Sequence, residues 1–183
     1  MDKITSQDFN HKTGIDNYDP NNIKRFRQSC KNPKLRNIYF RMINNDFFTH
    51  ERMFKYKMVE SPMCPRCGSI ENMKHQIWEC FEAQNIWNLY NNFIMTTKSP
   101  NTHLILNYES IFQTDNVDCI NIIKIKIVQE MIQIVRPTKW QKTDLVNLIQ
   151  NLKNMEKYNA KLNYVEDKIK LKWNITNTYL ETE

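Results

Sequence analysis

Glycine is scarce in this sequence. Only 2 of its 183 residues are glycines, against roughly 7% in an average protein. Tight β-hairpins usually need glycine because their turns require positive φ angles. A fold that is rich in hairpins is therefore disfavoured, and the composition predicts an all-α protein.

The sequence also lacks a long apolar run. No stretch of about 18 apolar residues occurs, so no membrane-spanning helix and no membrane partner are expected. The first twenty residues are polar, unlike those of a secretory signal peptide. The cysteines number five, an odd count. Together these features predict an intracellular, reducing environment, in which Cys30 and Cys119 are free, partly buried thiols.

Motifs of nucleotidyl transfer and nucleotide binding are missing as well. The sequence has no Asp-Asp pair, on which two-metal polymerase chemistry would depend, and no glycine-rich phosphate loop. The acids of the C-terminal half are scattered over predicted helix faces and read as solvated charge. The sequence therefore predicts no catalytic site, no enzyme activity and no small-molecule substrate.

Positive charge is present and unevenly distributed. The formal net charge is +6, and the stretch 24–57 holds ten Lys or Arg residues against two acids, Asp46 and Glu51. Aromatic residues are interleaved with these cations. Such a segment suits a polyanion. The alternative is a solvated basic surface with the aromatic side chains in the core.

Helical periodicity begins after residue 31. Asn32 and Pro33 are typical of an N-cap and a first helical position. The apolar residues that follow recur at helical spacing; they are Leu35, Ile38, Tyr39, Met42 and Ile43. Thr49 is predicted to cap a second helix, with Glu51 in its first turn.

Three further helical segments are predicted. One spans about 72–95. Another begins near 116 and is ended by Pro137; its many β-branched residues leave a strand as the competing interpretation. A last one is capped by Thr143 and continues to about Trp173, as one long helix or two. The expected organisation is a loosely ordered basic arm (1–31), a helical module that contains three of the five cysteines (32–98), and a C-terminal helical bundle or long helical hairpin (99–183).

A cluster of metal-ligating residues is the most specific motif. Cys64, Cys67, His75 and Cys80 follow the spacing C-x2-C-x7-H-x4-C. Structural zinc takes four Cys and His ligands at tetrahedral corners and leaves no open position for water. Gly68 permits the tight backbone after the second cysteine. The sequence therefore predicts one structural Zn²⁺, rather than buried thiols without a metal or a redox C-x-x-C, which lacks its βαβ context here.

The residues around this cluster resemble the zinc-binding domain at the C-terminal end of reverse transcriptases from non-LTR retrotransposons. The similarity runs from Leu35 to Trp87 through an aromatic-rich helix, the sequence CPRCGSIENMKHQIWEC, and a Trp that follows the last cysteine. Thr49, Glu71 and His75 match positions of the family pattern. A weaker similarity extends over about 31–174. Some relatives carry an endonuclease with a Pro-Asp motif beyond the cluster, but here Thr138 follows the proline, which does not support a nuclease.

The resemblance implies a module that contacts RNA or DNA beside a polymerase, either adopted by a host as a separate protein or excised from a longer one. We expect binding to RNA or single-stranded DNA, with a nuclear location. The predicted phosphate contacts are Arg25, Arg27, Lys34, Arg36, Arg41, Arg66 and Lys74. The alternative is a non-catalytic scaffold in a larger protein complex, which would use the apolar helix near 116–135 and the C-terminal stripe as its binding surface.

Overall fold

The computed structural model describes residues 15, 18–97, 106–133, 139–162 and 166–177. Within them the fold is all-α, as the scarcity of glycine predicted. The residues described contain no strand, and their only β pairing is a single bridge between Met63 and Ile70. No described helix is both long and apolar enough to cross a membrane. The chain divides into two compact units, and each is described by itself.

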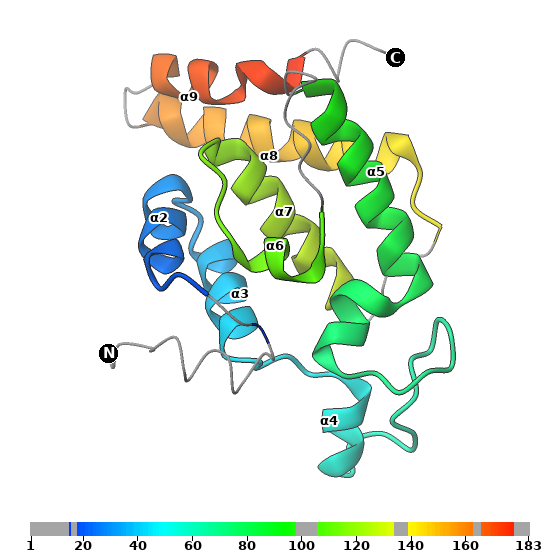
Figure 1. Cartoon of the computed structure of the whole chain (residues 1–183). Helices are drawn as coiled ribbons and strands as arrows, with labels where there is room; N and C mark the ends of the chain where they lie inside the picture. Colours follow the sequence, from blue (N-terminus) through cyan, green and yellow to red (C-terminus); the bar gives the residue numbers. More distant parts are fainter. Residues whose placement is uncertain (1–14, 16–17, 98–105, 134–138, 163–165, 178–183) are drawn as a thin grey trace. The chain divides into compact units, whose positions relative to one another are not determined.

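Unit 1 contains residues 1–84 and 107–138. Its helices are α2 (Asn21–Ser29), α3 (Pro33–Ile43), α4 (His50–Lys55), a π-helical turn (His75–Glu79), the first residues of α5 (Phe81–Thr97), α6 (Tyr108–Phe112) and α7 (Asp118–Met131). Helix α7 packs on both α2 and α3 (Figure 1). Ten of its fourteen residues are buried, so it is the central helix of this unit.

Both predicted caps at the start of unit 1 are confirmed. The Asn32 side chain accepts hydrogen bonds from the backbone N–H groups of Lys34 and Leu35, and Pro33 is the first residue of α3. The predicted apolar stripe of α3 is buried in full. Thr49 caps α4 by accepting a hydrogen bond from Arg52 N–H. Local sequence chemistry therefore determines where these two helices begin.

The expectation of a loosely ordered arm before residue 32 is wrong for its described part. Residues 21–29 form α2, and Phe26 is buried with its ring centroid 4.5 Å from that of Tyr39. The Asn22 side chain accepts hydrogen bonds from both the backbone N–H and the hydroxyl of Thr114. One aromatic ring and one amide hold this helix, so it has no apolar stripe for periodicity to detect. Residues 1–14 of the expected arm lie outside the described part of the chain.

The segment near 116–135 is a helix, and the competing strand is wrong. Helix α7 ends at Met131, before Pro137, and residues 134–138 are not among those described. The predicted helix over 72–95 is interrupted: the π-helical turn ends at Glu79, and α5 starts at Phe81. Helix α6 was not predicted.

Unit 2 contains residues 85–106 and 139–183. It holds the rest of α5, then α8 (Lys142–Leu162), α9 (Glu166–Trp173) and a short 3-10 turn (Asn174–Thr176). Helices α8 and α9 pack on each other, so the C-terminal stripe forms two helices. Trp173 is buried and donates its indole N–H to Glu156 at 2.9 Å.

The start of α8 differs from the expected cap. Thr143 lies inside the helix, and the side chain of Asp144 instead accepts a hydrogen bond from Gln141 N–H.

The units also group residues differently from the expected segments. Helix α2 belongs with α3, and residues 107–138 join the unit that carries the cysteine cluster.

Candidate metal centre

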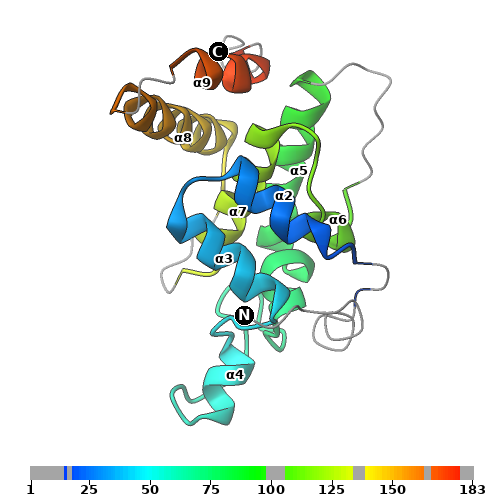
Figure 2. The same ribbon diagram turned by 90° about the vertical axis from the view of Figure 1, so that its left-hand side faces the viewer.

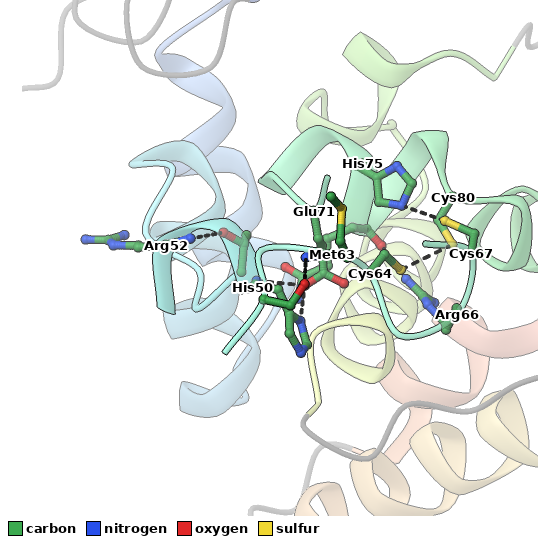
Figure 3. A network of polar contacts seen from close by, with 12 residues as sticks. His50, Arg52, Met63, Cys64, Arg66, Cys67, Glu71, His75 and Cys80 are labelled. Atoms are coloured by element: carbon green, nitrogen blue, oxygen red, sulfur yellow. Dashed lines mark hydrogen bonds and ion pairs between the residues drawn. The ribbon is translucent and has the colours of Figure 1, made fainter. Parts of the chain in front are cut away.

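The four predicted ligands meet at one point of unit 1. One ligand atom from each of Cys64, Cys67, His75 and Cys80 lies within 4.8 Å of all the others (Figure 3). The Sγ atoms of Cys64 and Cys80 are 4.0 Å apart, and Cys67 Sγ lies 3.2 Å from His75 Nε2. Zn–S bonds of about 2.3 Å at tetrahedral angles require sulfur atoms roughly 3.8 Å apart. The residues therefore fit a single tetrahedral zinc ion.

A tight hairpin presents the first two cysteines. Cys64 donates its N–H to Ser69 O at 2.7 Å, and Gly68 donates its N–H to Cys64 O at 2.8 Å. The backbone of Gly68 has φ +75°, in the left-handed region that glycine adopts without steric cost. The turn reverses the chain within a few residues, and both thiols thereby come to one side.

A π-helical turn brings in the other two ligands. In an α-helix of 3.6 residues per turn, side chains five residues apart point roughly 140° away from each other. A π-turn closes its hydrogen bond from residue i to i+5, and here Cys80 donates its N–H to His75 O at 3.0 Å. Residues five apart are then one turn apart, so the x4 spacing places both side chains on the metal. The start of this turn is fixed by Asn72, whose side chain accepts a hydrogen bond from His75 N–H at 2.8 Å.

Most of the centre is shielded from water. Cys64, His75 and Cys80 are buried, whereas Cys67 is exposed. Burial raises the pKa of the Cys64 thiol to about 11. Burial also acts to raise the pKa of Cys67, but hydrogen bonds to Ser69, Cys64 and Cys80 together outweigh it and the pKa is lowered. Zinc binds thiolates, so uptake of the metal displaces a proton from Cys64.

A comparison with protein families identifies this arrangement. Residues 8–87 match the family described as zinc-binding in reverse transcriptase, a range that contains all four ligands. Residues 8–87 are a reverse transcriptase zinc-binding domain. Comparisons with curated proteins and with solved structures give no match. The zinc-binding domain thus carries one structural zinc, held by three thiolates and one imidazole.

Glu71 and His50, which the sequence did not assign to the site, hold the zinc-binding domain together. The Glu71 side chain is fully buried. It accepts hydrogen bonds from the backbone N–H of His50 at 3.0 Å and from the ring Nδ1 of His50 at 2.9 Å. The backbone carbonyl of Glu71 also accepts the Glu51 N–H. This carboxylate therefore ties the start of α4 to the metal-binding loop. The position of Glu71 in the family pattern, four residues before His75, was the sequence feature that could have predicted this role.

Arg66 lies against the metal centre. Its guanidinium donates to the backbone carbonyl of Gln76 at 3.1 Å and acts to lower the pKa of Cys64, while its buried Nε and Nη1 atoms have no hydrogen-bond partner among the described residues. A zinc ion with three thiolates and one neutral imidazole has a net charge of −1, which a neighbouring guanidinium offsets. The predicted phosphate contact at Arg66 therefore has an internal role as well.

The other six predicted phosphate contacts all lie in unit 1, but their side chains have different partners. Arg36 donates to the backbone carbonyls of Cys30 and Arg27. Arg41 donates to Asp46 O, and its guanidinium carbon lies 5.6–5.7 Å from the ring centroids of two phenylalanines. Two further cations form ion pairs, Arg25 with Asp19 and Lys74 with Glu79. Arg27 and Lys34 are exposed, and within the described residues neither side chain forms an ion pair.

Proposed function

We propose that this protein is a non-catalytic nucleic-acid-binding module derived from a retrotransposon reverse transcriptase. Its ligand is RNA or single-stranded DNA, and its zinc ion stabilises the fold. A nuclear location follows from that ligand and belongs to the same proposal. Reverse transcriptases act on RNA and DNA, so the family of residues 8–87 supports this class of ligand.

The distribution of positive charge carries the proposal. Ten Lys and Arg residues lie between Lys24 and Lys57, and none of their side chains is buried. Only two acids lie in the same stretch, and both are exposed. A surface with this excess of cations attracts phosphates and releases their counterions, so affinity depends on charge more than on sequence.

Two features support the absence of catalysis. Four protein ligands complete a tetrahedral zinc, which leaves no position for an activated water molecule. The sequence has no adjacent aspartates for two-metal chemistry. The zinc ion is therefore proposed to act through folding alone.

The test is a fluorescence-anisotropy titration of the zinc-loaded protein with labelled single-stranded RNA, single-stranded DNA and duplex DNA, each at two salt concentrations. The best variant is Arg27→Gln/Lys34→Gln, because both side chains are exposed. Arg36 and Arg41 are less suitable, since both hold backbone carbonyls. The matched control is Lys157→Gln, an exposed lysine of α8.

We expect the double variant to weaken binding and to make the slope of log affinity against log salt shallower by about 1.4, since each lost contact to a single strand removes about 0.7. The control variant should bind like the wild type. If the wild-type protein binds none of the three nucleic acids at low salt, the proposal is wrong.

A scaffold that binds another protein is the second candidate. Helix α7, which the sequence offered as a partner surface, is mostly buried and is unavailable. Two exposed apolar side chains of unit 2 favour the candidate instead: Tyr158 on α8 is 65% exposed and Leu171 on α9 is 80% exposed. Sedimentation velocity of the wild type and of Leu171→Glu tests it; association that the variant abolishes would support a protein-binding surface.

A further inference from the structure

Helix α4 leaves its apolar side chains uncovered. None of its residues is buried, whereas five residues of α3 are buried. Three aromatic side chains on or beside α4 are about half exposed: Phe48 at 57%, Phe54 at 46% and Tyr56 at 60%. Exposed aromatic side chains that gather in one short segment are typical of a binding surface.

The ends of this helix, rather than a core, hold it in place. Its first turn is fixed by Thr49 and Glu71. At its C-terminus, Met58 N–H donates to Met53 O and Lys57 N–H donates to Phe54 O, which is the Schellman motif. The chain therefore holds residues 48–58, here called the α4 tip, in a defined conformation in which only the capping residue Thr49 is buried.

Cations alternate with the aromatic rings of the α4 tip. The tip contains three cations, Arg52, Lys55 and Lys57, and one acid, Glu51. Arg52 forms an ion pair with Asp46, and the side chains of Lys55 and Lys57 are exposed. Lys57 has φ +59°, a conformation that usually belongs to glycine at this position of the motif. The tip thus combines positive charge with the exposed rings of Phe54 and Tyr56, whereas the Arg41 guanidinium lies over the ring of Phe48, 5.6 Å from its centroid.

In both Figure 1 and Figure 2, α4 lies at one end of unit 1, away from α2 and α7 and next to the loop that carries the zinc hairpin. The two residues of the hairpin bridge add apolar surface, since Met63 is 44% exposed and Ile70 is 54% exposed. The tip and the hairpin together form the end of unit 1 that the other helices do not cover.

We infer that the α4 tip binds the unpaired bases of a single-stranded nucleic acid, with Phe48, Phe54 and Tyr56 as stacking rings and Lys55 and Lys57 as phosphate contacts. Non-specific single-strand sites combine cations that follow the backbone with aromatic side chains on which bases stack. Protein interfaces also use aromatic residues but are depleted of lysine, so the lysines favour nucleic acid. The inference rests on the proposed function and adds the surface that binds the strand and the contact with unpaired bases.

The experiment compares a fluorescein-labelled 20-nucleotide single strand with the blunt duplex of the same sequence. The test variant is Phe54→Leu/Tyr56→Leu, which keeps apolar volume and removes two rings. The control is Tyr158→Leu on α8, an equally exposed aromatic outside unit 1. Zinc content and circular dichroism establish that each variant is folded, which the absence of buried residues in α4 predicts.

The expected result is a loss of single-strand affinity of roughly 5- to 150-fold for each ring that stacks on a base, with a smaller change for the duplex and an unchanged salt slope. The Tyr158→Leu control should match the wild type. As a check that needs no variant, photocrosslinking of a strand that contains 5-iodouridine should map to residues 48–58.

Each other outcome overturns the inference in a recognisable way. If the wild type binds no nucleic acid, both the proposed function and the stacking surface are wrong. If the wild type binds but the double variant binds the single strand equally well, only the stacking surface is wrong. If that variant keeps nucleic-acid affinity but loses self-association in sedimentation, the tip contacts protein instead.

Discussion

Removal of the Glu71 carboxylate should loosen the zinc-binding domain without removing a metal ligand. The side chain is fully buried and accepts two hydrogen bonds, from the backbone N–H and the ring Nδ1 of His50. Each hydrogen bond to a charged group contributes about 1.5–3 kcal/mol. The His50 side chain is 23% exposed, so water reaches its ring in the variant and the lower end of that range applies. Glu71→Ala should therefore lower the free energy of unfolding by about 3 kcal/mol.

Glu71→Gln should cost less, about 1 kcal/mol, because both hydrogen bonds go to the same oxygen, Oε1, and an amide oxygen in that place can still accept them without the negative charge. Urea denaturation of the zinc-loaded proteins measures both values. Hydrogen exchange should show the loss of protection at the start of α4, where the carboxylate acts. The matched control is Glu60→Ala, an exposed acid eleven residues earlier in the chain. Stability of Glu71→Ala within 0.5 kcal/mol of the wild type would refute the view that this carboxylate joins α4 to the metal-binding loop.

Three further predictions concern the metal centre and the core of unit 1. Because the pKa of Cys64 is raised to about 11, this thiol is protonated when no metal is bound. Zinc must displace that proton, so the apparent zinc affinity should rise at least about tenfold per pH unit between pH 6 and 8. Competition with a chromophoric chelator measures this, and a flat profile would contradict it. Arg66→Met should weaken zinc binding about 10- to 100-fold, as expected for a group that orients a ligand, in the same chelator assay. Tyr39→Phe removes the hydroxyl that donates to Phe112 O at 2.7 Å and should destabilise the protein by about 1–2 kcal/mol in urea; an unchanged midpoint would argue against this bond.

The sequence predicts those features whose cause is local. Asn32 and Thr49 cap their helices through atoms two or three residues away, and the stripe of α3 follows directly from helical spacing. The set of zinc ligands is equally local, because all four lie within seventeen residues. The sequence alone therefore predicts the metal centre and the two helices α3 and α4 that lie before it.

The sequence does not predict features that depend on contacts with residues elsewhere in the chain. Helix α2 is held by Asn22 and Phe26 through partners far along the chain, at Thr114 and Tyr39. The π-helical turn brings His75 and Cys80 to one point, and the spacing of apolar residues does not predict it. The partners of Arg36 and Arg66 are backbone carbonyls of residues six to ten positions away, and a backbone carbonyl carries no sequence signal. Basic residues that look alike in the sequence therefore differ in the structure.

The sequence also could not separate core from surface among the aromatic residues. Phe47 is buried and Phe48 is 57% exposed, although the two are adjacent and chemically identical. The difference arises because successive residues outside a helix point to opposite sides of the chain. Only the fold shows which rings remain available for a ligand.

The most direct test of the central claim is the zinc content of the purified protein and its effect on folding. Native mass spectrometry should find one zinc ion per chain, and Cys80→Ser should lose it. Chelation of the metal should abolish the folded signal of the zinc-binding domain, since structural zinc sites contribute about 10–16 kcal/mol of binding free energy, as much as the stability of a typical domain. A wild-type protein that contains no zinc, or that unfolds at the same urea concentration with and without it, would contradict the account.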